Sequence, residues 1–225
     1  MSFKSPFFSD NQKVGLTFDL PRKESNCQKY CPVSGQCYIN DNLQDKVNKA
    51  YRKKLKRNFA LLNSKNFIPK MSRHLRSLNR LRVRLLSNGD IIYSDDFSKS
   101  DFQLENIFGL CKECQFNRFW LVTRNSNALF HYITKNEKPE NLNILLSIDA
   151  KTTNQGILDF CKAHRIQVCY ITENPKMANC PASVNGKSCE QNECFKCSEF
   201  DEAPRVWALH GKNNLKKLAK KKLTK

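Results

Sequence analysis

The spacing of hydrophobic and polar positions changes repeatedly along the chain, and the changes divide it into strands and helices. Apolar residues alternate with arginines over 81–85 and form short runs at 14–20, 118–123, 143–148, 167–171 and 205–209. These six runs, rich in Val, Ile, Leu and Phe, predict short strands. Between them, the spacing predicts helices over 43–63, 69–79, 101–114, 126–134 and 155–164.

Strands that alternate with short helices indicate a parallel sheet with helical crossovers. The sequence therefore predicts an α/β fold with six mostly parallel strands. Such a sheet either stays open or curls into a partial barrel. In both arrangements ligands bind at the carboxyl ends of the strands.

Polar residues follow each predicted strand. They are Cys27, Cys31 and Cys37 after the first strand, Asp90 after the second, Arg124 after the third, Asp149 after the fourth, Glu173 and Asn174 after the fifth, and His210 after the last. A single Asp or Asn at such a position is usually a helix cap or a turn residue. Polar residues in six loops at one edge of a sheet instead predict a ligand site there.

Three cysteines follow the first strand with the spacing C-x3-C-x5-C. They are Cys27, Cys31 and Cys37, and Pro32 and Gly35 provide turns between them. Three thiolates suit an iron–sulfur cluster with one open iron, or a zinc ion whose last ligand comes from elsewhere.

A second group, Cys180, Cys189, Cys194 and Cys197, has the spacing C-x8-C-x4-C-x2-C. Four thiolates this close predict a metal site, either tetrahedral zinc or a second iron–sulfur cluster. The remaining cysteines, at positions 111, 114, 161 and 169, are interpreted as small buried residues.

The chain has 225 residues, 11 of them cysteine, and neither a signal-peptide core nor a run of membrane-helix length stands out. We therefore expect a cytoplasmic protein with no membrane contact, in which clustered cysteines bind metal instead of forming disulfides. The formal charge of +18 predicts a polyanionic partner, with DNA or RNA ahead of anionic membranes.

The positive charge is concentrated in two places, and no acidic residue occurs between Asp45 and Asp90. A solvated surface is the simpler interpretation, but the absence of acids favours a phosphate-binding face. The predicted nucleic-acid contacts are Lys46, Lys49, Arg52, Lys53, Lys56, Arg57, Arg73 and Arg76, together with the tail residues Lys216, Lys217, Lys220, Lys221 and Lys222.

Several motifs together resemble a known family. They are C-x3-C-P-x4-CY, a basic Y-R-x5-RN-x-x-LL helix, LRVRLLSNGD, WLVTR, CPA-x4-GKSC-x4-C-x2-C and WALHGK. Over roughly residues 14–212 they are similar to the phage and plasmid "gene product eighty-eight" family, and the layout resembles a compact radical S-adenosylmethionine barrel. Typical radical S-adenosylmethionine enzymes carry C-x3-C-x2-C, so the longer second gap is a departure.

The resemblance implies a partial (β/α)6 barrel and a bacterial host. It implies that Cys27, Cys31 and Cys37 hold a four-iron cluster whose open iron binds S-adenosylmethionine. Gly89 and Asp90 would then bind the amine, Ser147 or Asp149 the ribose, and His210 the adenine. The catalytic residues stay unassigned.

The expected organisation is a lead-in (1–13), a barrel (14–174 and 203–212), a four-cysteine metal-binding segment (175–202) and a lysine-rich tail (213–225). The predicted function is a radical S-adenosylmethionine-like iron–sulfur enzyme that acts on nucleic acid or on a nucleic-acid-associated partner protein. The alternatives are a non-catalytic nucleic-acid-binding protein with structural zinc or iron–sulfur sites, and a two-cluster redox protein. The chain lacks the phosphate-cradling motif G-x-x-x-x-G-K-[ST] and the motif G-x-G-x-x-G.

Overall fold

The structure is a computed structural model that describes residues 5–11, 14–27, 49–148, 153–172, 174–185 and 187–208. Within these ranges, one sheet of seven strands follows chain order from β1 to β7. The strands are β1 (Phe8–Asn11), β2 (Gly15–Phe18), β3 (Arg82–Leu85), β4 (Arg118–Thr123), β5 (Leu142–Ser147), β6 (Gln167–Thr172) and β7 (Arg205–Ala208). β1 pairs antiparallel with β2, and every later pairing is parallel. The predicted α/β class with a mostly parallel sheet is confirmed.

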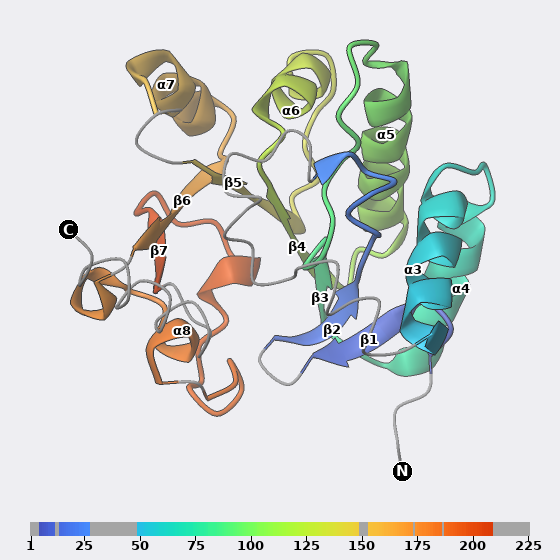
Figure 1. Ribbon diagram of the computed structural model, residues 1–225, viewed down its shortest axis with the longest axis horizontal. Helices are drawn as coiled ribbons and strands as arrows, with labels where there is room; N and C mark the ends of the chain where they lie inside the picture. Colours follow the sequence, from blue (N-terminus) through green and yellow to red (C-terminus); the bar gives the residue numbers. More distant parts are fainter. Residues whose placement is uncertain are drawn as a thin grey trace, which may run out of the picture.

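The helices of the described part are α3 (Lys49–Leu62), α4 (Phe67–Leu78), α5 (Ser98–Glu113), α6 (Ser126–Ile133), α7 (Gln155–Ala163) and α8 (Pro181–Asn185). Two 3-10 helices, η2 (Pro175–Met177) and η3 (Lys196–Ser198), flank α8. Figure 1 shows α3 to α7 arrayed along one side of the sheet and α8 on the other. Consecutive parallel strands that are neighbours need crossovers of one hand, which places their helices on one face.

Side chains of β3 and β4 alternate between the two faces of the sheet. Val83 and Leu85 point into the large core under the helices, whereas Arg82 and Arg84 point to the other face. Trp120 lies on that second face and packs with Leu145 and Cys169 in a smaller core. Every residue of β5 is buried, as expected for a parallel strand that is covered on both faces.

The described parts of the four-cysteine segment pack on the second face, where η3 contacts β4 and β5 and α8 contacts β7. Asn143 of β5 donates hydrogen bonds from its side-chain amide to the carbonyl oxygens of Cys197 and Glu199, each at 3.0 Å. The guanidinium of Arg82 stacks 3.8 Å from the ring centroid of Phe195. No helix in the described ranges is long and apolar enough to cross a bilayer.

Candidate ligand site and cysteine segment

Asp19 ties together the carboxyl ends of the first two parallel strands. It follows β2, is 3% exposed, and accepts hydrogen bonds at Oδ1 from the Ser87 hydroxyl (2.6 Å) and the Asn88 N–H (3.1 Å). Its Oδ2 accepts from the Thr17 hydroxyl (3.0 Å) and the Tyr51 hydroxyl (3.3 Å). Because four donors surround this carboxylate, it holds the loop after β3 and the helix α3 against β2.

Asp90 joins the loop after β3 to the loop after β4. Its Oδ1 accepts from the Ile91 N–H (2.8 Å) and the Thr123 hydroxyl (2.5 Å), and its Oδ2 from the Arg124 N–H (2.9 Å) and the Tyr93 hydroxyl (3.2 Å). Burial nevertheless raises the pKa of this carboxyl. The amine-binding role predicted for Asp90 would require a ligand to replace one of these bonds.

Gly89 lies where the loop after β3 closely approaches the loop after β2. Its φ is +77°, and a Cβ at this position would lie 2.7 Å from the carbonyl oxygen of Leu20. The Leu20 N–H in turn donates to the carbonyl oxygen of Asn88 at 2.9 Å. This close approach explains the glycine without reference to a ligand.

The loop after β2 carries the first predicted cluster ligand. Cys27 is half-buried, and its N–H donates to the carbonyl oxygen of Arg22 at 3.1 Å. The Asn26 side-chain amide donates to the carbonyl oxygen of Tyr93 at 2.9 Å, which joins this loop to the one after β3. Cys31, Cys37, Asp149, His210, Lys46 and the tail lysines lie outside the described residues.

Ser147 lies at the carboxyl end of β5, opposite Cys169 of β6. It is 5% exposed, and its hydroxyl acts on the Cys169 thiol in the direction that lowers the thiol's pKa. Burial raises the pKa of that thiol to about 12. Cys111, Cys114, Cys161 and Cys169 are all buried, as predicted.

The four cysteines of the C-terminal segment come within electrostatic range of one another. Burial, followed by the charges of Cys180 and Cys194, raises the pKa of Cys189 to about 11. Burial, with Cys180 and Cys189 among the further causes, raises the pKa of Cys197 to about 12. Arg84 opposes both shifts, so its guanidinium lies on the same side of the sheet as these thiols.

The raised pKa values leave the Cys189 and Cys197 thiols neutral at neutral pH. Among the residues that the structure describes, no three His, Cys, Asp or Glu side chains form an arrangement that could hold a metal ion. The Cys194 N–H donates to the carbonyl oxygen of Cys189 at 2.9 Å, and the Ser183 hydroxyl to that of Cys180 at 2.8 Å. These bonds fix the backbone around the thiols.

Most of the predicted nucleic-acid contacts in the described part are exposed on α3 and α4. The exposed ones are Lys49, Lys53, Lys56, Arg57, Arg73 and Arg76, whereas Arg52 is partly buried. Lys56 lies 3.9 Å from a carboxylate oxygen of Glu24, and Arg76 forms an ion pair with Glu113. Both pairs are solvent-exposed and hold their cations only weakly.

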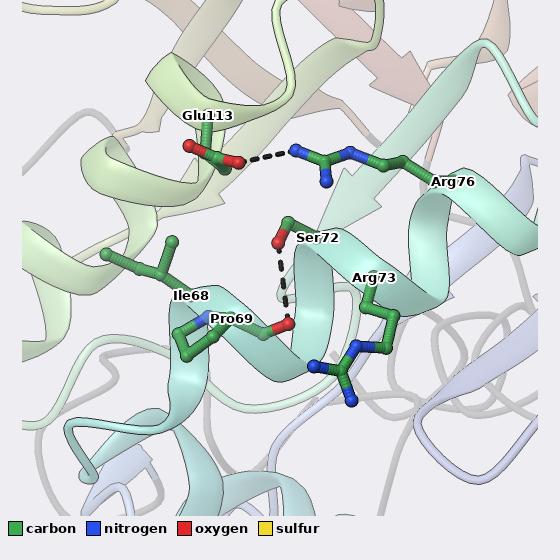
Figure 2. A pocket seen from close by; sticks show the side chains of 6 residues that line it. All are labelled: Ile68, Pro69, Ser72, Arg73, Arg76 and Glu113. Atoms are coloured by element: carbon green, nitrogen blue, oxygen red, sulfur yellow. Dashed lines mark hydrogen bonds and ion pairs between the residues drawn. The ribbon is translucent and has the colours of Figure 1, made fainter.

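A hollow of about 460 Å³ lies between α4 and α5, lined by Ile68, Pro69, Ser72, Arg73, Arg76 and Glu113. Figure 2 shows Arg76 reaching toward Glu113, while Arg73 projects to the other side. Arg73 is therefore the cation at this hollow that is best placed to meet an anion.

A further exposed group lies at the turn before β4. Phe116 is 95% exposed and Leu81 is 54% exposed. The Asn117 side chain donates to the carbonyl oxygen of Arg80 at 2.5 Å, and the Arg118 N–H to that of Leu81 at 2.7 Å. The turn thus carries an exposed aromatic ring, with the exposed Arg118 two positions later and the exposed Arg80 joined to the turn through its backbone.

Sequence reasoning missed Asp19, Arg22, Arg82 and Arg84. The signal for Asp19 is an acid directly after an apolar strand, and for Arg82 and Arg84 it is charge at alternate positions of a strand. Arg22 carries no sequence signal of its own.

The fold and the site define an α/β protein with loops tied together at the carboxyl edge of a parallel sheet and a cysteine segment on one face. The chain belongs to the Gene product 88 family, whose model matches residues 6–222. Comparisons with curated proteins and with solved structures give no match.

Proposed function

We propose that this protein is an iron–sulfur protein of the radical S-adenosylmethionine type, built on a partial (β/α)6 barrel, that acts on nucleic acid or a partner bound to nucleic acid. The observation that carries the proposal is the position of Cys27. It follows the first of six parallel strands that are neighbours in chain order. Barrels of parallel strands bind their ligands at this edge.

Cysteine thiols are the donors that the proposed metal groups take. Cys27, Cys31 and Cys37 would hold the first cluster, which when bound supplies an electron to S-adenosylmethionine. The four C-terminal thiols are donors of the kind that a second cluster or a zinc ion takes, but the described residues would have to move to bring three of them around one ion. Cys189 and Cys197 are protonated at neutral pH without metal, so binding would release their protons.

The chain's own contribution at this edge is rigidity. Asp19 and Asp90 join the loops after β2, β3 and β4 through hydrogen bonds, so the polar groups of these loops lie at the same edge of the sheet. Gly89, Ser147, Asp149 and His210 stay proposed contacts for S-adenosylmethionine.

The test is iron, sulfide and zinc analysis of protein purified without oxygen, with electron paramagnetic resonance before and after adding S-adenosylmethionine. We expect a reduced four-iron signal that changes with S-adenosylmethionine, and that Cys31→Ser removes while Cys194→Ser does not. Cys161→Ala is the control, because that buried thiol lies on α7. Loss of the signal in the control, or its persistence in Cys31→Ser, would contradict the ligand assignment.

A second candidate function is a non-catalytic nucleic-acid-binding protein with a structural metal. The exposed cations of α3 and α4, together with the exposed Phe116 two positions before the exposed Arg118, favour it. Aromatic rings beside cations bind single strands by base stacking. Zinc without iron or sulfide in the same analysis would select this candidate.

Binding is measured by fluorescence anisotropy with single- and double-stranded oligonucleotides over a range of salt concentrations. Replacing Lys49 and Lys53 by Gln should make the dependence of log affinity on log salt shallower. Phe116→Ala should weaken single-strand binding without changing that slope, with Phe116→Tyr as the control. Unchanged binding in all these variants would place the interface elsewhere.

A further inference from the structure

Arg22 is a buried cation at the carboxyl edge of the sheet. It is 3% exposed, and its Nε is inaccessible to solvent and has no hydrogen-bond partner. In the part of the chain that the structure describes, no ion pair involves this guanidinium. A guanidinium stays charged and carries five N–H donors, so burying it without an acceptor is unfavourable.

The nearby carboxylates are engaged elsewhere. Asp19 and Asp90 each accept four hydrogen bonds from other residues. Glu24, two positions further along the chain, lies beside Lys56. The cation is therefore not provided with a counterion by the acids that frame this edge.

The backbone around Arg22 is held firmly. Its carbonyl oxygen accepts from the Cys27 N–H at 3.1 Å and from the Ser25 hydroxyl at 3.3 Å. The Tyr93 N–H donates to the carbonyl oxygen of Ser25 at 3.3 Å, which anchors the turn to the loop after β3. A buried charge on a fixed turn at the ligand-binding edge is organised before any ligand arrives.

We propose that Arg22 binds an oxyanion, a carboxylate or a phosphate group of a ligand, at the carboxyl edge of the sheet. Both groups offer two oxygens at the spacing of the guanidinium fork and accept paired, charge-assisted hydrogen bonds. The site needs no metal, so the proposal does not rest on the iron–sulfur assignment.

The experiment compares wild type with Arg22→Met, which keeps the length of the side chain without its charge, and with Arg22→Lys. Lys23→Met is the matched control, because Lys23 is the exposed neighbour on the same turn. Melting temperatures are measured with inorganic phosphate or acetate at tens of millimolar, against sodium chloride of equal ionic strength. All samples carry the same measured metal content.

Wild type and Lys23→Met should melt at higher temperature in one of the two anions. A response to phosphate indicates a phosphoryl ligand, and a response to acetate indicates a carboxylate. Arg22→Met should melt at or above the wild-type temperature without anion, because an unpaired buried charge is gone, and should show no response. Arg22→Lys should show a reduced response, since a lysine cannot bind both oxygens as a fork.

Three outcomes would overturn the proposal. They are a wild type that responds to neither anion, an Arg22→Met protein that responds as wild type does, and an Arg22→Met protein that melts well below wild type without anion. The last would mean that the guanidinium has a structural partner within the chain. None of them bears on the cluster signal, so the iron–sulfur proposal succeeds or fails separately.

Discussion

Two glycines with the same backbone conformation provide a direct test of how the carboxyl edge is assembled. Gly89 and Gly15 both have a φ of +77°. An added Cβ at Gly15 meets no atom within 4 Å, whereas at Gly89 it meets the Leu20 carbonyl oxygen at 2.7 Å and the Leu20 Cβ at 2.8 Å. Gly15→Ala therefore measures the conformational cost alone, and Gly89→Ala measures that cost plus the contact.

The magnitude follows from the two terms. A left-handed conformation costs an L-residue about 1–2 kcal/mol, and the stiffer unfolded chain of the alanine variant returns about 0.4–1 kcal/mol. Gly15→Ala should thus lower the free energy of unfolding by about 1 kcal/mol. At Gly89 the neighbour is backbone and cannot rotate away, so overpacking adds about 1–3 kcal/mol. The expected total for Gly89→Ala is about 2–4 kcal/mol.

Urea unfolding followed by circular dichroism measures both values. Equal losses for the two variants would refute the close approach of the loops after β2 and β3. If Gly89 serves a ligand alone, Gly89→Ala should behave like Gly15→Ala in stability and differ only in ligand binding.

Two further changes test the cysteine segment and the buried acid. Asn143→Leu leaves the carbonyl oxygens of Cys197 and Glu199 without their donor. It should lower the free energy of unfolding by about 2–5 kcal/mol and speed metal release to a chelator. Asn136→Ala, at an exposed position, is the control, and an equal loss of stability in both variants would contradict the anchoring role of Asn143. Asp90→Asn should be less stable than wild type, because the amide cannot accept all four hydrogen bonds. The folded-state pKa of Asp90 is raised, so its proton stabilises the fold below the unfolded value of 3.8 and that stabilisation is lost as pH rises through the folded pKa. The stability gap between Asp90→Asn and wild type should therefore narrow with rising pH, and a gap that is constant from acid to neutral pH in urea unfolding would contradict this.

The parallel sheet could be predicted because its evidence is local. The alternation at 81–85 shows in five adjacent letters and corresponds to β3, in which Val83 and Leu85 are buried. β1 gave no such signal, because Phe8–Asn11 contains one apolar residue and lies at the edge of the sheet. The helix expected from residue 101 begins at Ser98, since its first turn is polar and carries no periodic pattern.

The ties at the carboxyl edge could not be predicted, because they join residues far apart in sequence. Asp19 bonds to Ser87 and Asn88, and Thr123 bonds to Asp90. From the letters alone, each acid is a turn residue with no preferred partner. Only the packing of β2, β3 and β4 side by side determines which donors reach it.

The sequence also could not show which cations of the long basic stretch are exposed. The sequence shows one run without acids between Asp45 and Asp90. In the fold, some cations of this run are exposed on α3 and α4, and others face into the protein. Arg82 stacks on Phe195, Arg84 lies near the thiols of Cys189 and Cys197, and the Lys54 ammonium donates to the carbonyl oxygen of Phe8 at 2.7 Å. These cations face inward and are not available to a polyanion.

The inward-facing arginines of β3 determine how metal binding would change the charge balance at the cysteine segment. Four thiolates around a dication carry net negative charge, and two arginines of β3 lie on the face that the segment covers. Without metal, the raised pKa values keep Cys189 and Cys197 neutral, so these two thiols provide no charge to compensate the arginines. We therefore expect metal binding to stabilise β3 and the cysteine segment together, so that the charge in the strand and the cysteines 100 residues later act as one unit.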